Sequence, residues 1–141
     1  MKINFKKLNE NARTPFHANY GDAGSDLFSS IEIEIPPHAI GIVETGIAAE
    51  IPYGFVGYIN PRSSMAMKGI GIMNAPGTID SGYRGEIKVL LVNHSATPYK
   101  VNIGDKIAQI VIHKYEPVDF EETHELQDSM RGTGGFGSTG K

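Results

Sequence analysis

The sequence predicts an all-β fold, a jelly-roll-like β-sandwich or barrel with one short helix and a flexible Gly-rich C-terminal arm. Short segments rich in Ile, Val, Tyr and Phe alternate with turn positions, which 17 Gly and 8 Pro supply. No long amphipathic helical pattern lies between these segments. Regularly spaced short strands without intervening helices favour antiparallel sheets over a parallel nucleotide-binding sheet.

The clearest strand pattern occurs at residues 31–35. Ile31, Ile33 and Ile35 alternate there with Glu32 and Glu34, and two prolines follow. The three isoleucines therefore share one face and the two glutamates face water. Further strands are expected at residues 40–44, 55–60, 87–93 and 106–113, and a short one is expected to begin near Asp26.

One helical turn is expected at residues 63–68, because Ser can cap it and the Met and Ala residues that follow are acceptable helix formers. Backbone N–H groups at its start would point toward an anion. Arg62 and the hydroxyls of Ser63 and Ser64 would supplement them. The alternative is an ordinary turn with a Ser cap and a solvated Arg.

Length and composition indicate a single domain. The chain has 141 residues, of which 40% are hydrophobic, enough for one compact core. We expect that domain at residues 1–125 and the arm at residues 126–141, where so much Gly cannot belong to a packed core.

Charge and cysteine content exclude several classes of function. Thirteen Lys and Arg against sixteen Asp and Glu give a net charge of -3, so we expect no nucleic-acid binding driven by basic charge. A few Arg side chains and N–H groups could still hold a nucleotide. The absence of Cys removes disulfides and thiolate metal sites. Residues 1–16 contain no apolar run of signal-peptide or membrane length, so we expect no membrane association and a cytoplasmic location.

The C-terminal segment has two interpretations. Gly132, Gly134 and Gly137 have the spacing of a dinucleotide-binding fingerprint, but no strand precedes them and no helix follows, so the match is false. Composition alone favours a disordered terminus. Arg131 and Phe136 favour a segment that folds over a phosphorylated ligand with a ring, the cation on phosphate and the aromatic ring on the base.

Carboxylates and histidines give weaker signals. Asp80 and Tyr83 lie in the turn-rich stretch 76–85, on or beside a hairpin, where most carboxylates are only turn residues. Asp26 and Asp105 each follow a Gly-containing turn and could accept local backbone hydrogen bonds. The five His residues show no metal-ligand spacing.

Taken in order, five segments resemble the five motifs of the trimeric dUTPase family. They are residues 23–27, 61–66, 74–85, 104–109 and 131–140. Five ordered matches are far more specific than any one of them. The resemblance implies hydrolysis of dUTP to dUMP and pyrophosphate, by in-line attack of water on the α-phosphorus with Mg²⁺ as cofactor.

The same resemblance implies a role for each matching residue. Asp80 would orient and deprotonate the attacking water, and Asp26 would bind Mg²⁺ through water. Tyr83 would lie beneath the deoxyribose and exclude a ribose 2′-OH. The nucleoside-binding residues would be Asn74, Gly77, Thr78, Ile79, Tyr83 and Phe136. The phosphate-binding residues would be Arg62, Ser63, Ser64, Lys88, Gln109, Arg131, Gly137 and Ser138.

The resemblance also implies a homotrimer with shared active sites. The third motif would come from one chain, the first, second and fourth from another, and the arm from the remaining chain. A monomer would be inactive. Two departures from the family pattern stand near the site: Ser64 replaces a frequent Gly, and Gly82 replaces a frequent acidic residue.

Two other functions remain open at this point. dCTP deaminase shares the fold and a similar Arg-Ser-Ser segment, but Leu90 stands where its catalytic Glu is expected, and an apolar residue cannot run deamination. A non-catalytic dUTP-binding regulatory module on the same fold is the second, since fold alone does not fix function.

Overall fold

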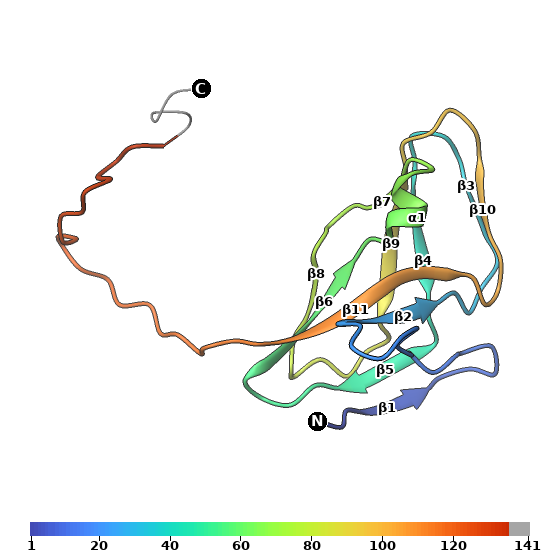
Figure 1. Ribbon diagram of the computed structural model, residues 1–141, viewed down its shortest axis with the longest axis horizontal. Helices are drawn as coiled ribbons and strands as arrows, with labels where there is room; N and C mark the ends of the chain where they lie inside the picture. The colour runs from blue at the N-terminus through green and yellow to red at the C-terminus, as the bar shows by residue number, and fades with distance from the viewer. Residues whose placement is uncertain (136–141) are drawn as a thin grey trace.

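The computed structural model describes residues 1–135, and it confirms an all-β chain with one short helix (Figure 1). The helix α1 (Ser63–Ala66) lies between the sixth and seventh strands. The strands are β1 (Asn4–Lys7), β2 (Gly24–Phe28), β3 (Ile33–Ile35), β4 (Ile40–Glu44), β5 (Ile47–Glu50), β6 (Phe55–Asn60), β7 (Ile70–Ile72), β8 (Gly77–Ile79), β9 (Lys88–Asn93), β10 (Tyr99–Val101) and β11 (Lys106–Lys114).

Every strand pair in the described part of the chain is antiparallel. The largest sheet has the order β2-β11-β6-β8, and a second sheet has the order β4-β9-β7. Two smaller pairs, β1-β5 and β10-β3, complete the arrangement. The long strand β11 is therefore the inner strand that joins β2 to β6.

The longer strands agree with the sequence-based expectation. β4 and β6 have the predicted bounds, and β9 and β11 differ from them by one residue. β3 begins at Ile33, two residues later than predicted, because the backbone N–H and carbonyl of Ile31 both bond to the Ser29 hydroxyl instead of a ladder partner.

The predicted serine cap of the helix is wrong. Arg62 occupies the N-cap position with extended backbone angles and makes no side-chain cap hydrogen bond. Its carbonyl accepts the first helical hydrogen bonds, from the N–H groups of Met65 and Ala66, both at 3.0 Å. Ser63 and Ser64 are therefore inside the first turn, and the Arg62 side chain is directed elsewhere, to β2.

Aliphatic side chains from the two larger sheets and the two smaller pairs fill the core. They include Leu27, Ile35, Val43, Ile47, Ile59, Leu91, Val101 and Ile107, each at most 2% exposed. Asn93 is buried among them with full hydrogen bonding. Its amide donates to the carbonyls of Ile35 at 3.0 Å and Thr97 at 2.8 Å, and its carbonyl oxygen accepts from the Ser95 N–H at 2.9 Å. One side chain thus fastens β9 to β3 and to the following loop.

Beyond β11 the chain leaves the sheets. The Tyr115 N–H still donates to the Gly54 carbonyl, but residues 116–133 are all exposed, and Figure 1 shows this segment running away from the body in orange and red. The boundary expected between residues 125 and 126 remains a prediction. Within residues 1–135, no helix is long and apolar enough to span a bilayer.

Replacing Asn93 with Ala should lower the free energy of unfolding by about 2–3 kcal/mol, because buried carbonyl and N–H groups lose their partner. Urea denaturation measures the change. Asn4→Ala is the matched control, since the Asn4 amide bonds Glu50 at an exposed site and its loss should cost little. Equal losses for the two variants would contradict this role of Asn93.

Candidate active site

A cluster of polar side chains forms where β2, β11 and β6 run side by side. Gln109 of β11 lies opposite Asp26 of β2 on one side and opposite Asn60 of β6 on the other. With Gly24 and Asp22, these residues line a depression of about 440 Å³. The first, second and fourth sequence motifs therefore meet on one face of this sheet.

Asp26 is the centre of this cluster. It is 8% exposed, and its two carboxylate oxygens face different cations. Arg62 Nε lies 3.2 Å from Oδ1, and Lys106 Nζ lies 2.6 Å from Oδ2. Arg62 Nη1 donates to the Ser64 hydroxyl at 3.4 Å and to the Lys106 carbonyl at 3.3 Å. The carboxylate thus orders a guanidinium and an ammonium at the edge of the depression.

Gln109 reaches this cluster because position 24 carries no side chain. A Cβ atom on Gly24 would clash with the Gln109 side-chain amide, which lies against the Gly24 backbone. The amide Nε2 donates to the Pro61 carbonyl at 3.3 Å, beside the start of α1. Ser63, the first residue of the helix, is exposed next to it. The structure thus brings together the predicted residues Asp26, Arg62, Ser63, Ser64 and Gln109.

The third motif lies at the opposite edge of the same sheet. β8 pairs with β6 so that Gly77 lies opposite Ile59 and Ile79 opposite Gly57. Asp80 follows directly and is exposed. It lines a hollow of about 310 Å³ together with Tyr58, Thr78, Ser81 and Tyr115.

Two side chains of this motif fold back onto glycines. The Asn74 amide lies beside Gly77, where a Cβ would approach its Nδ2 to 3.3 Å. The Tyr83 ring occupies the space of a missing side chain at Gly85, and its hydroxyl donates to the Glu86 carbonyl at 2.9 Å. Asn74 and Tyr83 are both exposed, so each can meet a ligand from outside the chain.

The two groups do not meet within one chain. β2 and β8 are the outer strands of a four-stranded sheet, separated by three inter-strand steps and therefore by about 14 Å. Asp26 and Asp80 are attached to these outer strands, and a hydrogen-bonded sheet holds them apart.

The other predicted phosphate ligands are placed differently. Lys88 belongs to the β4-β9-β7 sheet, where its ammonium contacts Glu44 at 2.7 Å and Glu86 at 3.5 Å. The hydrogen bond to Glu44 raises the pKa of Lys88 above its ordinary value. Arg131 lies on the exposed arm and donates to the Gly134 carbonyl at 2.8 Å. Phe136, Gly137 and Ser138 lie outside the described residues.

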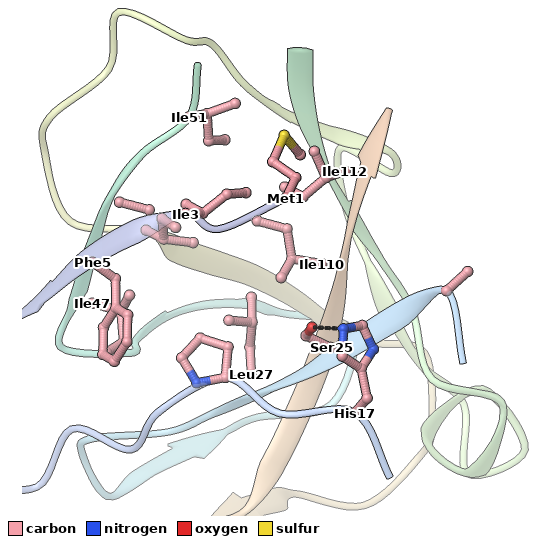
Figure 2. Close-up of a pocket in the computed structure, with 14 residues that line it drawn as sticks. Met1, Ile3, Phe5, His17, Ser25, Leu27, Ile47, Ile51, Ile110 and Ile112 are labelled. Carbon is pink, nitrogen blue, oxygen red and sulfur yellow. Dashed lines mark hydrogen bonds between the residues drawn. The ribbon is translucent and has the colours of Figure 1, made fainter. Parts of the chain in front are cut away.

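An apolar cavity of about 380 Å³ lies on the other face of β2 (Figure 2). Ser25 and Leu27 point into it, whereas Asp26 between them belongs to the polar cluster. The Ser25 hydroxyl and His17 Nε2 are 3.1 Å apart at its rim. Strand alternation thus separates this cavity from the polar cluster, and its walls are mostly apolar, which suits no phosphate.

Histidines and the remaining carboxylates add no metal centre. Within residues 1–135, no three His, Asp or Glu side chains gather in a metal-binding group. All five His residues are exposed. Asp105 accepts the Asn102 N–H at 2.8 Å, which confirms the structural interpretation of this residue.

The sequence did not single out Lys106, although it bonds the central carboxylate. A β-bulge between Lys106 and Ala108 shifts the register of β11 against β2. Ile107 and Ala108 are consequently both buried. Two adjacent apolar residues at the start of an alternating strand were the available signal for such a bulge.

Comparison with known proteins identifies the family. The dUTPase family model matches residues 10–140. A deoxyuridine 5'-triphosphate nucleotidohydrolase of Corynebacterium glutamicum is 50% identical over 141 residues, 99% of this chain and 95% of that protein. One of Clostridioides difficile is 46% identical over 139 residues, 98% of this chain and 97% of that protein.

Solved structures give the same result. A Staphylococcus bacteriophage 80alpha dUTPase bound to dUpNHpp matches with a TM-score of 0.93 and 27% identity, covering 99% of each chain. A dUTPase of phage phi11 of S. aureus, whose structure concerns a structural Mg(II) ion, matches with a TM-score of 0.84 and 27% identity, covering 89% of this chain and 99% of that one. The fold, the ordered motifs and these relatives together show that the chain belongs to the dUTPase family.

Proposed function

We propose that the chain hydrolyses dUTP to dUMP and pyrophosphate at sites that form between copies of the chain. The observation that carries this proposal is the division of the motif residues into two groups at opposite edges of one sheet. Membership in the dUTPase family supplies the substrate and the reaction. The separation of the two groups within one chain explains why several copies of the chain would assemble to form a site.

The cluster around Asp26 binds the triphosphate in this proposal. The Arg62 guanidinium belongs to this cluster, and it shares the carboxylate of Asp26 with the ammonium of Lys106. Hydroxyl and amide donors from Ser63, Ser64 and Gln109 lie beside it. Charge-assisted hydrogen bonds from such a group are the strongest that a protein offers to phosphate oxygens. Ser64 adds a donor that Gly would lack.

The donor set also fits a hydrated magnesium ion. Mg²⁺ retains much of its water and is bound by few carboxylates together with substrate phosphates. Asp26 is one carboxylate at the rim of the polar depression, and a single carboxylate suffices for contact through water. Bound there with the triphosphate, Mg²⁺ would neutralise phosphate charge during the displacement. Asp26 would hold the water molecules around it.

Asp80 serves as the general base. An exposed carboxylate that follows the last residue of β8 is free to accept a proton from a water molecule held against the α-phosphorus. The hairpin residues Asn74, Gly77, Thr78 and Ile79 bind uracil beside it. Tyr83, folded over Gly85, lies beneath the deoxyribose and rejects a 2′-hydroxyl by steric exclusion.

The arm closes the site from a third chain. Residues 116–133 are exposed over their whole length, and Val118, Phe120 and Leu126 are 66%, 97% and 87% exposed. Such a segment makes little contact with its own chain, so its apolar side chains are available to pack against another chain. Arg131 then supplies a further cation to the phosphates, and Phe136, Gly137 and Ser138 complete the lid.

The second sheet offers a surface for the homotrimer. Ile40 and Ile42 of β4 are 49% and 56% exposed, at alternate positions that normally carry polar residues on a solvent-facing strand. Ile42 lies opposite Leu90 of β9, so their side chains share that face. Packing of this face against two further copies would cover it.

The alternatives are less favoured. Leu90, on this same apolar face, provides no carboxylate for the deamination of dCTP. A regulatory module that only binds dUTP would have no use for the free carboxylate of Asp80.

Asp80→Asn should reduce turnover of dUTP by about 10²–10⁴-fold while binding is largely retained, because the amide keeps the shape but cannot accept the proton. Pyrophosphate release measures turnover, and calorimetry with a non-hydrolysable analogue measures binding. Glu32→Gln, which changes an exposed carboxylate outside the five motifs, is the control and should leave turnover and binding unchanged. Unchanged turnover of Asp80→Asn would favour the binding-only alternative.

Mixing two inactive variants tests the shared site. Chains with Asp80→Asn and chains with Arg62→Gln, unfolded together and refolded, should regain about one quarter of the wild-type rate, because a random trimer places an intact Asp80 opposite an intact Arg62 in that fraction of sites. Separately refolded variants are the control. A mixture no more active than its components would show that both residues act within one chain.

Ile42→Lys should convert the trimer to inactive monomers, since a desolvated ammonium at the apolar face opposes association. Light scattering gives the mass, and pyrophosphate release gives the rate. Ile103→Lys, at an isoleucine that is 43% exposed outside this face, should remain trimeric and active. A stable, active trimer of Ile42→Lys would remove the face from the proposed interface.

A further inference from the structure

Lys106 lies in the polar cluster, where regular strand alternation would not place it. On β11, Gln109 faces the polar cluster, and strict alternation would place Lys106 on the opposite face with Ala108 and Ile110. The bulge moves Ile107 into the core, where it is 1% exposed, and turns Lys106 to the side of Gln109. Bulges re-aim side chains in this way beside functional sites.

The redirected ammonium lies between two partners. On one side it contacts Asp26 Oδ2 at 2.6 Å. On the other side it lies 5.2 Å from the centroid of the Phe16 ring, within the range of a cation–π interaction. The Phe16 carbonyl also accepts the Asp26 N–H at 2.9 Å, which fixes the Phe16 backbone beside β2. Phe16, Lys106 and Asp26 therefore form one connected clamp.

The clamp affects Arg62 through the shared carboxylate. Arg62 Nε holds Oδ1 of Asp26 while Lys106 holds Oδ2. Without Lys106, the whole negative charge of this nearly buried carboxylate would fall to Arg62. A guanidinium that compensates a buried carboxylate alone is less available to a second anion, because leaving the carboxylate unpaired is costly.

We propose that Lys106, held between Phe16 and Asp26, is a positioning residue that shares the charge of Asp26 and thereby leaves Arg62 available to the triphosphate. This role rests on the proposed function, since it presupposes that Arg62 binds phosphate. Lys106 itself acts through Arg62 and makes no contact with substrate. The Phe16 ring keeps the ammonium on Asp26 and out of the phosphate site.

Lys106→Met tests the clamp, because Met keeps the aliphatic length and removes the charge. We expect KM for dUTP, and Kd for dUTP measured by calorimetry in EDTA without Mg²⁺, to rise about tenfold, with kcat changed less than about twofold. Lys106→Arg should restore both constants. Phe16→Leu should raise both by about threefold, since it removes the ring but keeps an apolar side chain. Lys114→Met, an exposed lysine on the same strand, should change neither.

A double-variant cycle separates this role from direct phosphate binding. In an Arg62→Gln background, Lys106→Met should weaken dUTP binding no further, because the residue it acts through is gone. Additive losses would overturn the proposal in favour of a direct contact, and unchanged Kd for Lys106→Met alone would overturn it outright. Failure of the wild-type chain to hydrolyse dUTP would instead contradict the proposed function. Melting temperatures confirm that every variant is folded.

Discussion

The candidate site depends on the hydrogen-bond register of a single strand. β11 pairs with β2 on one side and with β6 on the other, and this places Gln109 between Asp26 and Asn60. Arg62 lies one residue beyond Pro61, the first residue after β6, and turns its guanidinium back to Asp26. These side chains belong to hydrogen-bonded strands or to residues close to a strand end. Backbone hydrogen bonds therefore fix the distances between the side chains before any ligand binds.

The sequence predicted the fold class and the longer strands for a clear physical reason. The longer strands coincide with segments rich in Ile, Val, Tyr and Phe that have turn residues nearby, and β4 also alternates between exposed and buried residues. β7, β8 and β10 have three residues each, too few to show a period, and all four residues of β1 are exposed. The helix begins at Ser63 as predicted but ends at Ala66 instead of Lys68, and its N-cap is Arg62 instead of a serine.

The sequence named candidate residues for the site but not their arrangement. Ordered motifs named Asp26, Arg62, Asp80 and Gln109, yet a linear pattern does not reveal that β2 and β8 are the two outer strands of one sheet. The role of Lys106 depends on a bulge, which changes the face of one side chain without changing any residue type. Lys88 was a candidate phosphate ligand, but the sequence did not indicate that Glu44 and Glu86 lie close enough to pair with its ammonium.

The close approach of Gln109 to Gly24 has a consequence for natural variation. The space that a Cβ at position 24 would need is filled by an amide from a neighbouring strand. Within this family, a larger residue at 24 is sterically compatible only with a shorter or redirected one at 109. A side chain at position 24 would therefore displace the Gln109 amide, although the two positions are far apart in the sequence.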